Sequence, residues 1–121
     1  WLGKKLINDI GSDRLRILWD PANSLYANEP TYPDGWEALK NGYIGHFHIK
    51  DAKVNMAHAH VEFCEMGKGD MAPYLEPLAN AMKLNNYNGY ISLESVYRPE
   101  GGSFEDGYRA SLPKFKELFD W

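Results

Sequence analysis

The sequence predicts an α/β fold in which about three parallel strands alternate with helices. Three segments rich in β-branched and aromatic residues (14–20, 43–50 and 90–96) are separated by segments whose apolar residues recur at helical spacing. Strands that alternate with helices in this way form right-handed parallel βα units. The chain has 121 residues, of which 44% are hydrophobic and 14% aromatic, enough to build one core.

The helices can be placed from their apolar spacing and their end signals. A first helix is predicted over residues 1–10, with Gly11 as a left-handed cap. A short helix begins at Asp34 or Gly35 and ends near Gly42. These helices lie on either side of the first predicted strand, as a βα repeat requires.

The second half of the chain repeats this order. A long polar loop is expected from the end of the second strand to Gly69. Asp70 can cap the helix that follows, in which Pro77 predicts a kink or a late start. The pattern from Phe104 to Phe119 predicts a closing helix after the third strand.

Three parallel strands do not close a barrel, so they form either a small three-layer sheet or a slice of an eight-stranded one. A free slice leaves two unpaired strand edges, which proteins usually avoid. We therefore expect the slice to associate through these edges, as a homo-oligomer or with further strands. The sequence opens at Trp1, inside a predicted helix, which suggests that upstream strands are absent.

Composition excludes several functional classes. The net charge of −4 gives no general attraction to nucleic acid or to an anionic membrane. No apolar run approaches the roughly 20 residues that span a bilayer. The single Cys64 cannot form an internal disulfide and fits a reducing compartment, so we expect a cytoplasmic protein.

Each predicted strand has an ionisable residue at its carboxyl end, on the face opposite its apolar residues. These residues are Asp20, His48 and Glu94. Each alone is more often a cap or a salt-bridge partner. Together, at the edge where α/β proteins build their sites, they form a mixed nitrogen and oxygen set that suits Mn²⁺, Mg²⁺, Co²⁺ or Zn²⁺. We therefore predict a divalent-metal site.

Four short motifs carry a family resemblance. They are DPANS (20–24), GHFHIKDA (45–52), MGKGDM (66–71) and YNGYISLES (87–95). In this order and spacing the chain resembles the C-terminal portion of the xylose-isomerase-like TIM barrels. That superfamily includes sugar-phosphate isomerases, ketose 3-epimerases, inosose dehydratases and endonuclease IV enzymes.

The resemblance implies that residues 1–121 are the C-terminal part of one TIM-barrel domain, its last three βα units. It implies a metal-dependent sugar or sugar-phosphate isomerase or epimerase that transfers a proton through an enediolate. Asp20, His48 and Glu94 match three family metal ligands, and a fourth, a glutamate, would lie on a preceding strand. Glu94 would also be one of the catalytic acid–base pair, with that missing glutamate as the other.

Other polar residues have both functional and structural interpretations. Asn23 and Lys50 are candidate substrate-binding residues that could contact a sugar hydroxyl, although Asn23 could equally stabilise a turn. Asp51 is more consistent with orienting a neighbour, and His46 with a structural role. The His58 and His60 pair is a weak candidate for a substrate or metal site.

Three alternatives remain open at this point. A lyase on the same scaffold, such as an inosose or dehydroshikimate dehydratase, would use the same ligands. An endonuclease IV-like enzyme is disfavoured, because Asn23 stands where those enzymes place a histidine and the chain is acidic. A truncated, non-catalytic barrel fragment is the third alternative.

Overall fold

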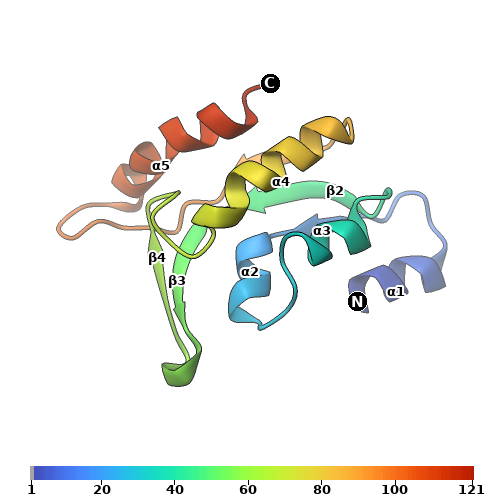
Figure 1. Cartoon of the computed structure of the whole chain (residues 1–121), viewed down its shortest axis with the longest axis horizontal. Coiled ribbons are helices and arrows are strands. Elements are labelled where there is room, and N and C mark those ends of the chain that lie inside the picture. Colours follow the sequence, from blue (N-terminus) through green and yellow to red (C-terminus); the bar gives the residue numbers. More distant parts are fainter. Residues whose placement is uncertain (1) are drawn as a thin grey trace.

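The computed structural model describes residues 2–121, so Trp1 of the first predicted helix lies outside the described residues. The elements alternate as expected, with two strands and two short helices beyond those predicted (Figure 1). In chain order they are α1 (Leu2–Ile10), β1 (Ile17–Trp19), α2 (Pro21–Tyr26), α3 (Asp34–Leu39), β2 (Ile44–Ile49), β3 (Asp51–Asn55), the 3₁₀ turn η1 (Met56–His58), β4 (His60–Cys64), α4 (Ala72–Leu84), β5 (Tyr90–Leu93) and α5 (Phe104–Phe119).

The three predicted strands form one parallel sheet in the order β1-β2-β5. In the register, Trp19 lies beside Phe47, and Phe47 lies beside Ile91. The described part of the sheet does not close on itself, which confirms the prediction of a partial, open arrangement. Among residues 2–121, no helix is both long and apolar enough to cross a membrane.

The hydrophobic core lies between one face of this sheet and helices α3, α4 and α5. Phe47 and Ile49 of β2 are 0% and 1% exposed, and Trp36 of α3 packs 6.2 Å from the Phe47 ring. Further buried residues come from α4 and α5: Leu75, Leu78, Ala79, Met82, Leu118 and Phe119. The alternation predicted for the strands is therefore confirmed, because their apolar side chains face the helices.

The opposite face of the sheet has no helix packed on it in the described chain. Leu18 of β1 is 51% exposed and Tyr90 of β5 is 80% exposed, although both belong to strands. His46, His48 and Ser92 share this face and are only partly buried. The polar residues of the strands are thus collected on one open surface, where a ligand can reach them.

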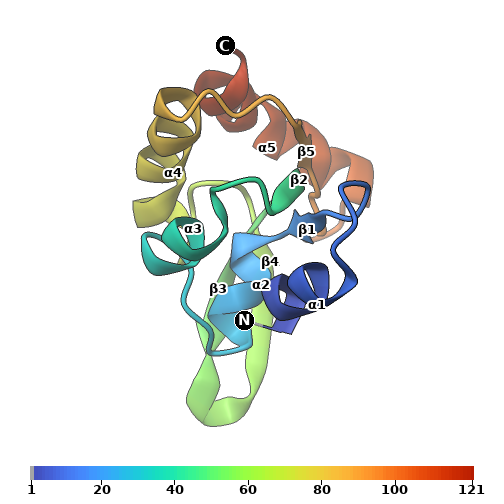
Figure 2. The ribbon, with the colours of Figure 1, turned by 90° about the vertical axis from the view of Figure 1, so that its right-hand side faces the viewer.

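The polar loop expected between the second strand and Gly69 is instead an antiparallel hairpin of β3 and β4, so that prediction was wrong. Five residue pairs join the two strands, from Asp51 with Cys64 at the base to Asn55 with His60 at the tip. The hairpin projects away from the sheet and helices in both views (Figures 1 and 2). The side chains of DAKVN and HVEFC alternate between the two faces, which is compatible with a strand pair. Because the segment is polar, it was predicted as a loop.

Several helix ends follow the predicted signals. Gly11 ends α1 with φ of 65°, as expected of a left-handed cap. The closing helix predicted from Phe104 to Phe119 has these bounds, and a capping box of Ser103 and Asp106, which was not predicted, starts it. At α4 the prediction was wrong: Met71 is the N-cap residue, and the Asp70 carboxylate instead accepts a hydrogen bond from the Val54 backbone N–H at 2.7 Å.

Candidate metal centre

The ends of the three parallel strands bring Asp20, His48 and Glu94 together. Asp20 directly follows β1, His48 lies near the end of β2, and Glu94 directly follows β5. The Glu94 backbone N–H donates to the Ile49 carbonyl at 2.9 Å, which extends the β2–β5 ladder to the site. Each residue offers one ligand atom, and these three atoms lie within 4.8 Å of one another.

Asp20 divides its two carboxylate oxygens between a helix and the cluster. Oδ1 accepts hydrogen bonds from the backbone N–H groups of Ala22 and Asn23 and so caps α2. Oδ2 is buried, faces the cluster, and has no well-oriented hydrogen bond among the described residues. The two interpretations of Asp20 in the sequence, a cap and a cluster residue, therefore describe different atoms of one side chain.

The Lys50 ammonium lies between the two carboxylates. Its Nζ is 2.6 Å from Asp20 Oδ2 and 2.6 Å from Glu94 Oε2, and the side chain is 7% exposed. On the other side of Glu94, Oε1 lies 3.4 Å from His48 Nδ1. Lysine, histidine and two carboxylates therefore form one continuous polar cluster.

The charges of this cluster shift the pKa values of its members. The hydrogen bond from Lys50 lowers the pKa of Glu94, whereas burial raises the pKa of Asp20 despite the attraction of Lys50. Burial by itself would lower the pKa of Lys50, but the two carboxylates outweigh it and raise that pKa above its ordinary value. The ammonium is thus held in its charged form.

A divalent cation fits these residues on chemical grounds. The donor set is two carboxylates and an imidazole, which suits hard and borderline divalent ions. Asp20 Oδ2 is a buried oxygen with an unused hydrogen-bonding position, and a cation already stands beside it in the form of Lys50. The cluster therefore attracts positive charge at Asp20 Oδ2.

Residues of β2 and β5 pack beside His48. His46 Nε2 lies 2.7 Å from the Ser92 hydroxyl oxygen, across the β2–β5 pair. The His46 and His48 rings are nearly perpendicular, with centroids 4.9 Å apart. His46 therefore packs beside the cluster and is anchored to the adjacent strand, in keeping with the structural role predicted for it.

Asn23 lies at the edge of the site and is exposed in the first turn of α2. Its side-chain oxygen accepts a hydrogen bond from the Tyr26 hydroxyl. This contact stabilises the turn, and it leaves the amide nitrogen available to other partners. Its substrate-binding role stays a prediction.

Asp51, adjacent to Lys50, is a structural anchor. The carboxylate is 2% exposed and accepts hydrogen bonds from the backbone N–H groups of Gly67, Gly69 and Met71 at 2.9 to 3.0 Å. A Cβ on Gly69 would lie 2.3 Å from Asp51 Oδ1, so this close approach requires glycine. Two N–H groups of the GKG segment (67–69), those of Gly67 and Gly69, are therefore occupied by a carboxylate of the chain itself.

The remaining candidates lie away from the cluster. His58 and His60 are exposed at the tip of the hairpin. The hairpin projects away from the parallel sheet (Figure 1). Neither belongs to the group of converging ligand atoms that the described residues form. Nothing in their surroundings adds to the weak prediction made for them.

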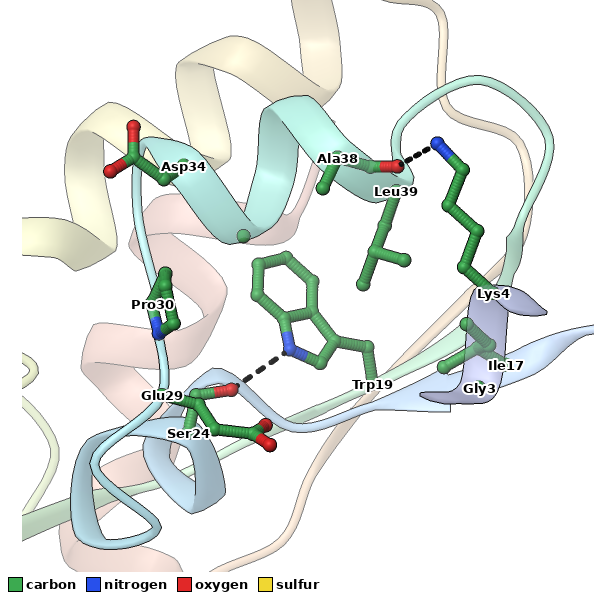
Figure 3. Close-up of a pocket in the computed structure, with 11 residues that line it drawn as sticks. Gly3, Lys4, Ile17, Trp19, Ser24, Glu29, Pro30, Asp34, Ala38 and Leu39 are labelled. Atoms are coloured by element: carbon green, nitrogen blue, oxygen red, sulfur yellow. Dashed lines mark hydrogen bonds between the residues drawn. The ribbon is translucent and has the colours of Figure 1, made fainter. Parts of the chain in front are cut away.

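A cavity of about 200 Å³ lies on the helix side of β1, apart from the cluster. Trp19 is one of the residues that line it and donates a hydrogen bond from Nε1 to the Ser24 hydroxyl at 3.2 Å (Figure 3). Its walls come from α1, α3 and the segment before α3. Asp20, His48 and Glu94 do not line it, so this cavity is a gap in the helix layer rather than part of the candidate centre.

The fold and the cluster define the class of protein: a parallel βα chain with its polar site at the carboxyl ends of the strands. A family described as xylose isomerase-like TIM barrel matches residues 2–118, nearly the whole chain. The chain belongs to this family, and its open three-stranded sheet is a partial TIM barrel. Comparisons with curated proteins and with solved structures gave no significant match.

Proposed function

We propose that this protein is a divalent-metal-dependent isomerase or epimerase of a sugar or sugar phosphate. The family includes enzymes of this kind. The observation that carries the proposal is the convergence of Asp20, His48 and Glu94 within 4.8 Å at consecutive strand ends. We propose further that the chain supplies the last three βα units of the barrel, and that other strands cover its open face.

Asp20, His48 and Glu94 would hold Mn²⁺, Mg²⁺, Co²⁺ or Zn²⁺, and such an ion supplies Lewis-acid polarisation of a sugar carbonyl. Asp20 suits this task because Oδ1 is fixed by the α2 backbone while Oδ2 faces the cluster, where the Lys50 ammonium is its neighbour. His48 is held by the β2 backbone and by the packing of His46. The ligand atoms are therefore positioned by secondary structure rather than by flexible loops.

Glu94 is the residue best suited to transfer the proton. Its side chain is 38% exposed, so it can reach a substrate on the open face. Because Lys50 lowers the pKa of Glu94, the carboxylate is ionised near neutral pH and can accept a proton. In the proposed reaction Glu94 takes the proton from the carbon next to the carbonyl, and the substrate becomes an enediolate.

Lys50 and Asn23 would contact the substrate oxygens. The Lys50 ammonium is charged, and negative charge that develops on an enediolate oxygen would be stabilised by it. The Asn23 amide nitrogen is exposed and can donate to a sugar hydroxyl. These roles follow from the position of both residues beside the cluster.

The proposal is tested by exchange of a substrate proton with solvent. The protein is incubated in D2O with Mn²⁺ or Co²⁺ and a series of ketoses and ketose phosphates, and proton NMR follows the signal of the carbon-bound hydrogen. Exchange with at least one sugar is expected, together with its loss in Glu94→Gln. Glu76→Gln, on the exposed side of α4, is the control and should retain it.

Two results would contradict this assignment. Absence of exchange with every sugar, together with loss of water from an inosose, would favour the lyase alternative. Exchange that survives unchanged in Glu94→Gln would mean that another residue takes the proton.

A further inference from the structure

Lys50 occupies the same oxygen atoms that a metal ion would use. Nζ contacts Asp20 Oδ2, the oxygen left free by the α2 cap, and also Glu94 Oε2, each at 2.6 Å. The ammonium also lies 5.8 Å from the centre of the Phe63 ring on β4. Its side chain is 7% exposed, so this arrangement is enclosed by protein rather than formed at the surface.

This position makes Lys50 a counter-ion for two carboxylates that would otherwise repel each other. Asp20 is 3% exposed at its side chain, and a buried carboxylate without a partner is costly. One ammonium in contact with both offsets part of that cost. The chain can therefore keep its two carboxylate ligands in place without a metal ion.

The same position opposes the binding of a divalent cation. A second cation at Asp20 Oδ2 would lie within a few ångströms of the ammonium, and like charges at that distance repel strongly in a partly buried site. Binding would require Lys50 to withdraw from Oδ2 or to remain at the cost of this repulsion. Either way, the lysine lowers the affinity of the cluster for the ion.

We propose that Lys50 is an internal counter-cation that stabilises the metal-free site and competes with the divalent ion for Asp20 and Glu94. The proposal rests on the proposed metal centre and extends it, since it assigns to Lys50 a role in metal affinity as well as in substrate contact.

The first test is a titration of the full chain with Mn²⁺, in which electron paramagnetic resonance measures the free ion. Lys50→Met, which keeps an unbranched side chain shorter by one atom and removes the charge, should bind Mn²⁺ at least tenfold more tightly than the wild type. Lys53→Met is the matched control, because Lys53 is an exposed lysine on β3, close in sequence. Its affinity should stay within about twofold of the wild type.

The second test is thermal unfolding in EDTA and in saturating Mn²⁺. Without metal, Lys50→Met should unfold at a lower temperature than Lys53→Met, because two carboxylates lose their counter-ion. With Mn²⁺, the unfolding temperature of Lys50→Met should rise more than that of the wild type. Lys50→Gln provides a second variant if Lys50→Met is not obtained folded in EDTA.

The outcomes separate this proposal from the proposed function. If wild type and Lys50→Met bind Mn²⁺ with equal affinity, the competition is refuted while the metal centre stands. If only the Lys50 variants bind, the competition is supported and metal dependence of the wild type is refuted. If none binds, both proposals are overturned. If both Lys50 variants fail to fold even with Mn²⁺ while the wild type binds the ion, the competition is overturned and the metal centre stands.

Discussion

Substitution of Asp20 can separate the two tasks of its carboxylate. Oδ1 caps α2 through the N–H groups of Ala22 and Asn23, whereas Oδ2 faces Lys50 and the proposed ion. Asparagine is as good an N-cap residue as aspartate, but it has no negative charge. Asp20→Asn should therefore keep the cap and lose the ligand, whereas Asp20→Ala should lose both.

The size of the difference follows from these contacts. Both variants remove the charge that faces Lys50, so this loss cancels when they are compared. What remains is the cap, and loss of a cap costs roughly 1 kcal/mol. For a chain of this size that corresponds to about 4 °C in unfolding temperature, by which Asp20→Ala should lie below Asp20→Asn.

The assays are thermal unfolding by circular dichroism in EDTA and Mn²⁺ titration. Both variants should bind Mn²⁺ more than tenfold less tightly than the wild type. Asp13→Asn, at an exposed position before β1, is the control for removal of one negative charge. Equal stability of Asp20→Asn and Asp20→Ala would refute the capping argument, and unchanged Mn²⁺ affinity in Asp20→Asn would refute the ligand assignment.

Three further predictions concern the framework around the site. Asp51→Asn should lower the free energy of unfolding in urea by about 3 kcal/mol, because one carbonyl oxygen cannot replace a carboxylate that accepts several backbone N–H bonds. Asp70→Asn, which affects a single exposed bond, should lower it by about 1 kcal/mol. Equal losses would contradict the anchoring role of Asp51. Gly107→Ala should destabilise the protein by at least about 2 kcal/mol, because a Cβ at this position of α5 would lie 1.9 Å from the Tyr97 carbonyl oxygen. An unchanged unfolding midpoint would show that α5 can shift without cost. Burial raises the pKa of Cys64 from 9.0 to about 11, so iodoacetamide at pH 8 should alkylate the folded chain about a hundredfold more slowly than the urea-unfolded chain. The stability of the folded state should fall as the pH rises from 9 towards 11. Similar alkylation rates in the two states would contradict the burial argument.

The alternation of strands and helices could be predicted because each element carries its own local signal. The three parallel strands and the polar side chain at the end of each follow from residue spacing, and the structure confirms their adjacency. Likewise, the end of α1 at Gly11 and the extent of α5 from Phe104 to Phe119 depend on residues close in sequence. Such features need no knowledge of distant contacts.

The helix α2 was missed although a signal for it exists in the sequence. Asp20 followed by Pro21 is an N-cap residue followed by proline at the first helical position, which is a common helix start. The helix has only six residues and no recognisable apolar repeat, so residue spacing did not predict it. The hairpin β3–β4 was missed for a related reason, because its polar side chains suggested a loop.

The position of Lys50 could not be predicted from local pattern. Its partners Asp20 and Glu94 lie on other strands, and both contacts depend on the order β1-β2-β5. The same holds for Asp51, whose partners in 67–71 are brought to it by the hairpin. Sequence reasoning placed Lys50 beside the site, and only the packed strands show that it contacts both carboxylates.

The proposed function rests on one claim, that Asp20, His48 and Glu94 hold a single divalent ion together. Anomalous X-ray scattering from crystals of the protein grown with Mn²⁺ tests this claim directly. We predict one strong manganese peak about 2.1 to 2.3 Å from Asp20 Oδ2, from one Glu94 oxygen and from one His48 ring nitrogen. Crystals that hold Lys50 between the two carboxylates at saturating Mn²⁺, with no peak at the strand ends, would contradict it.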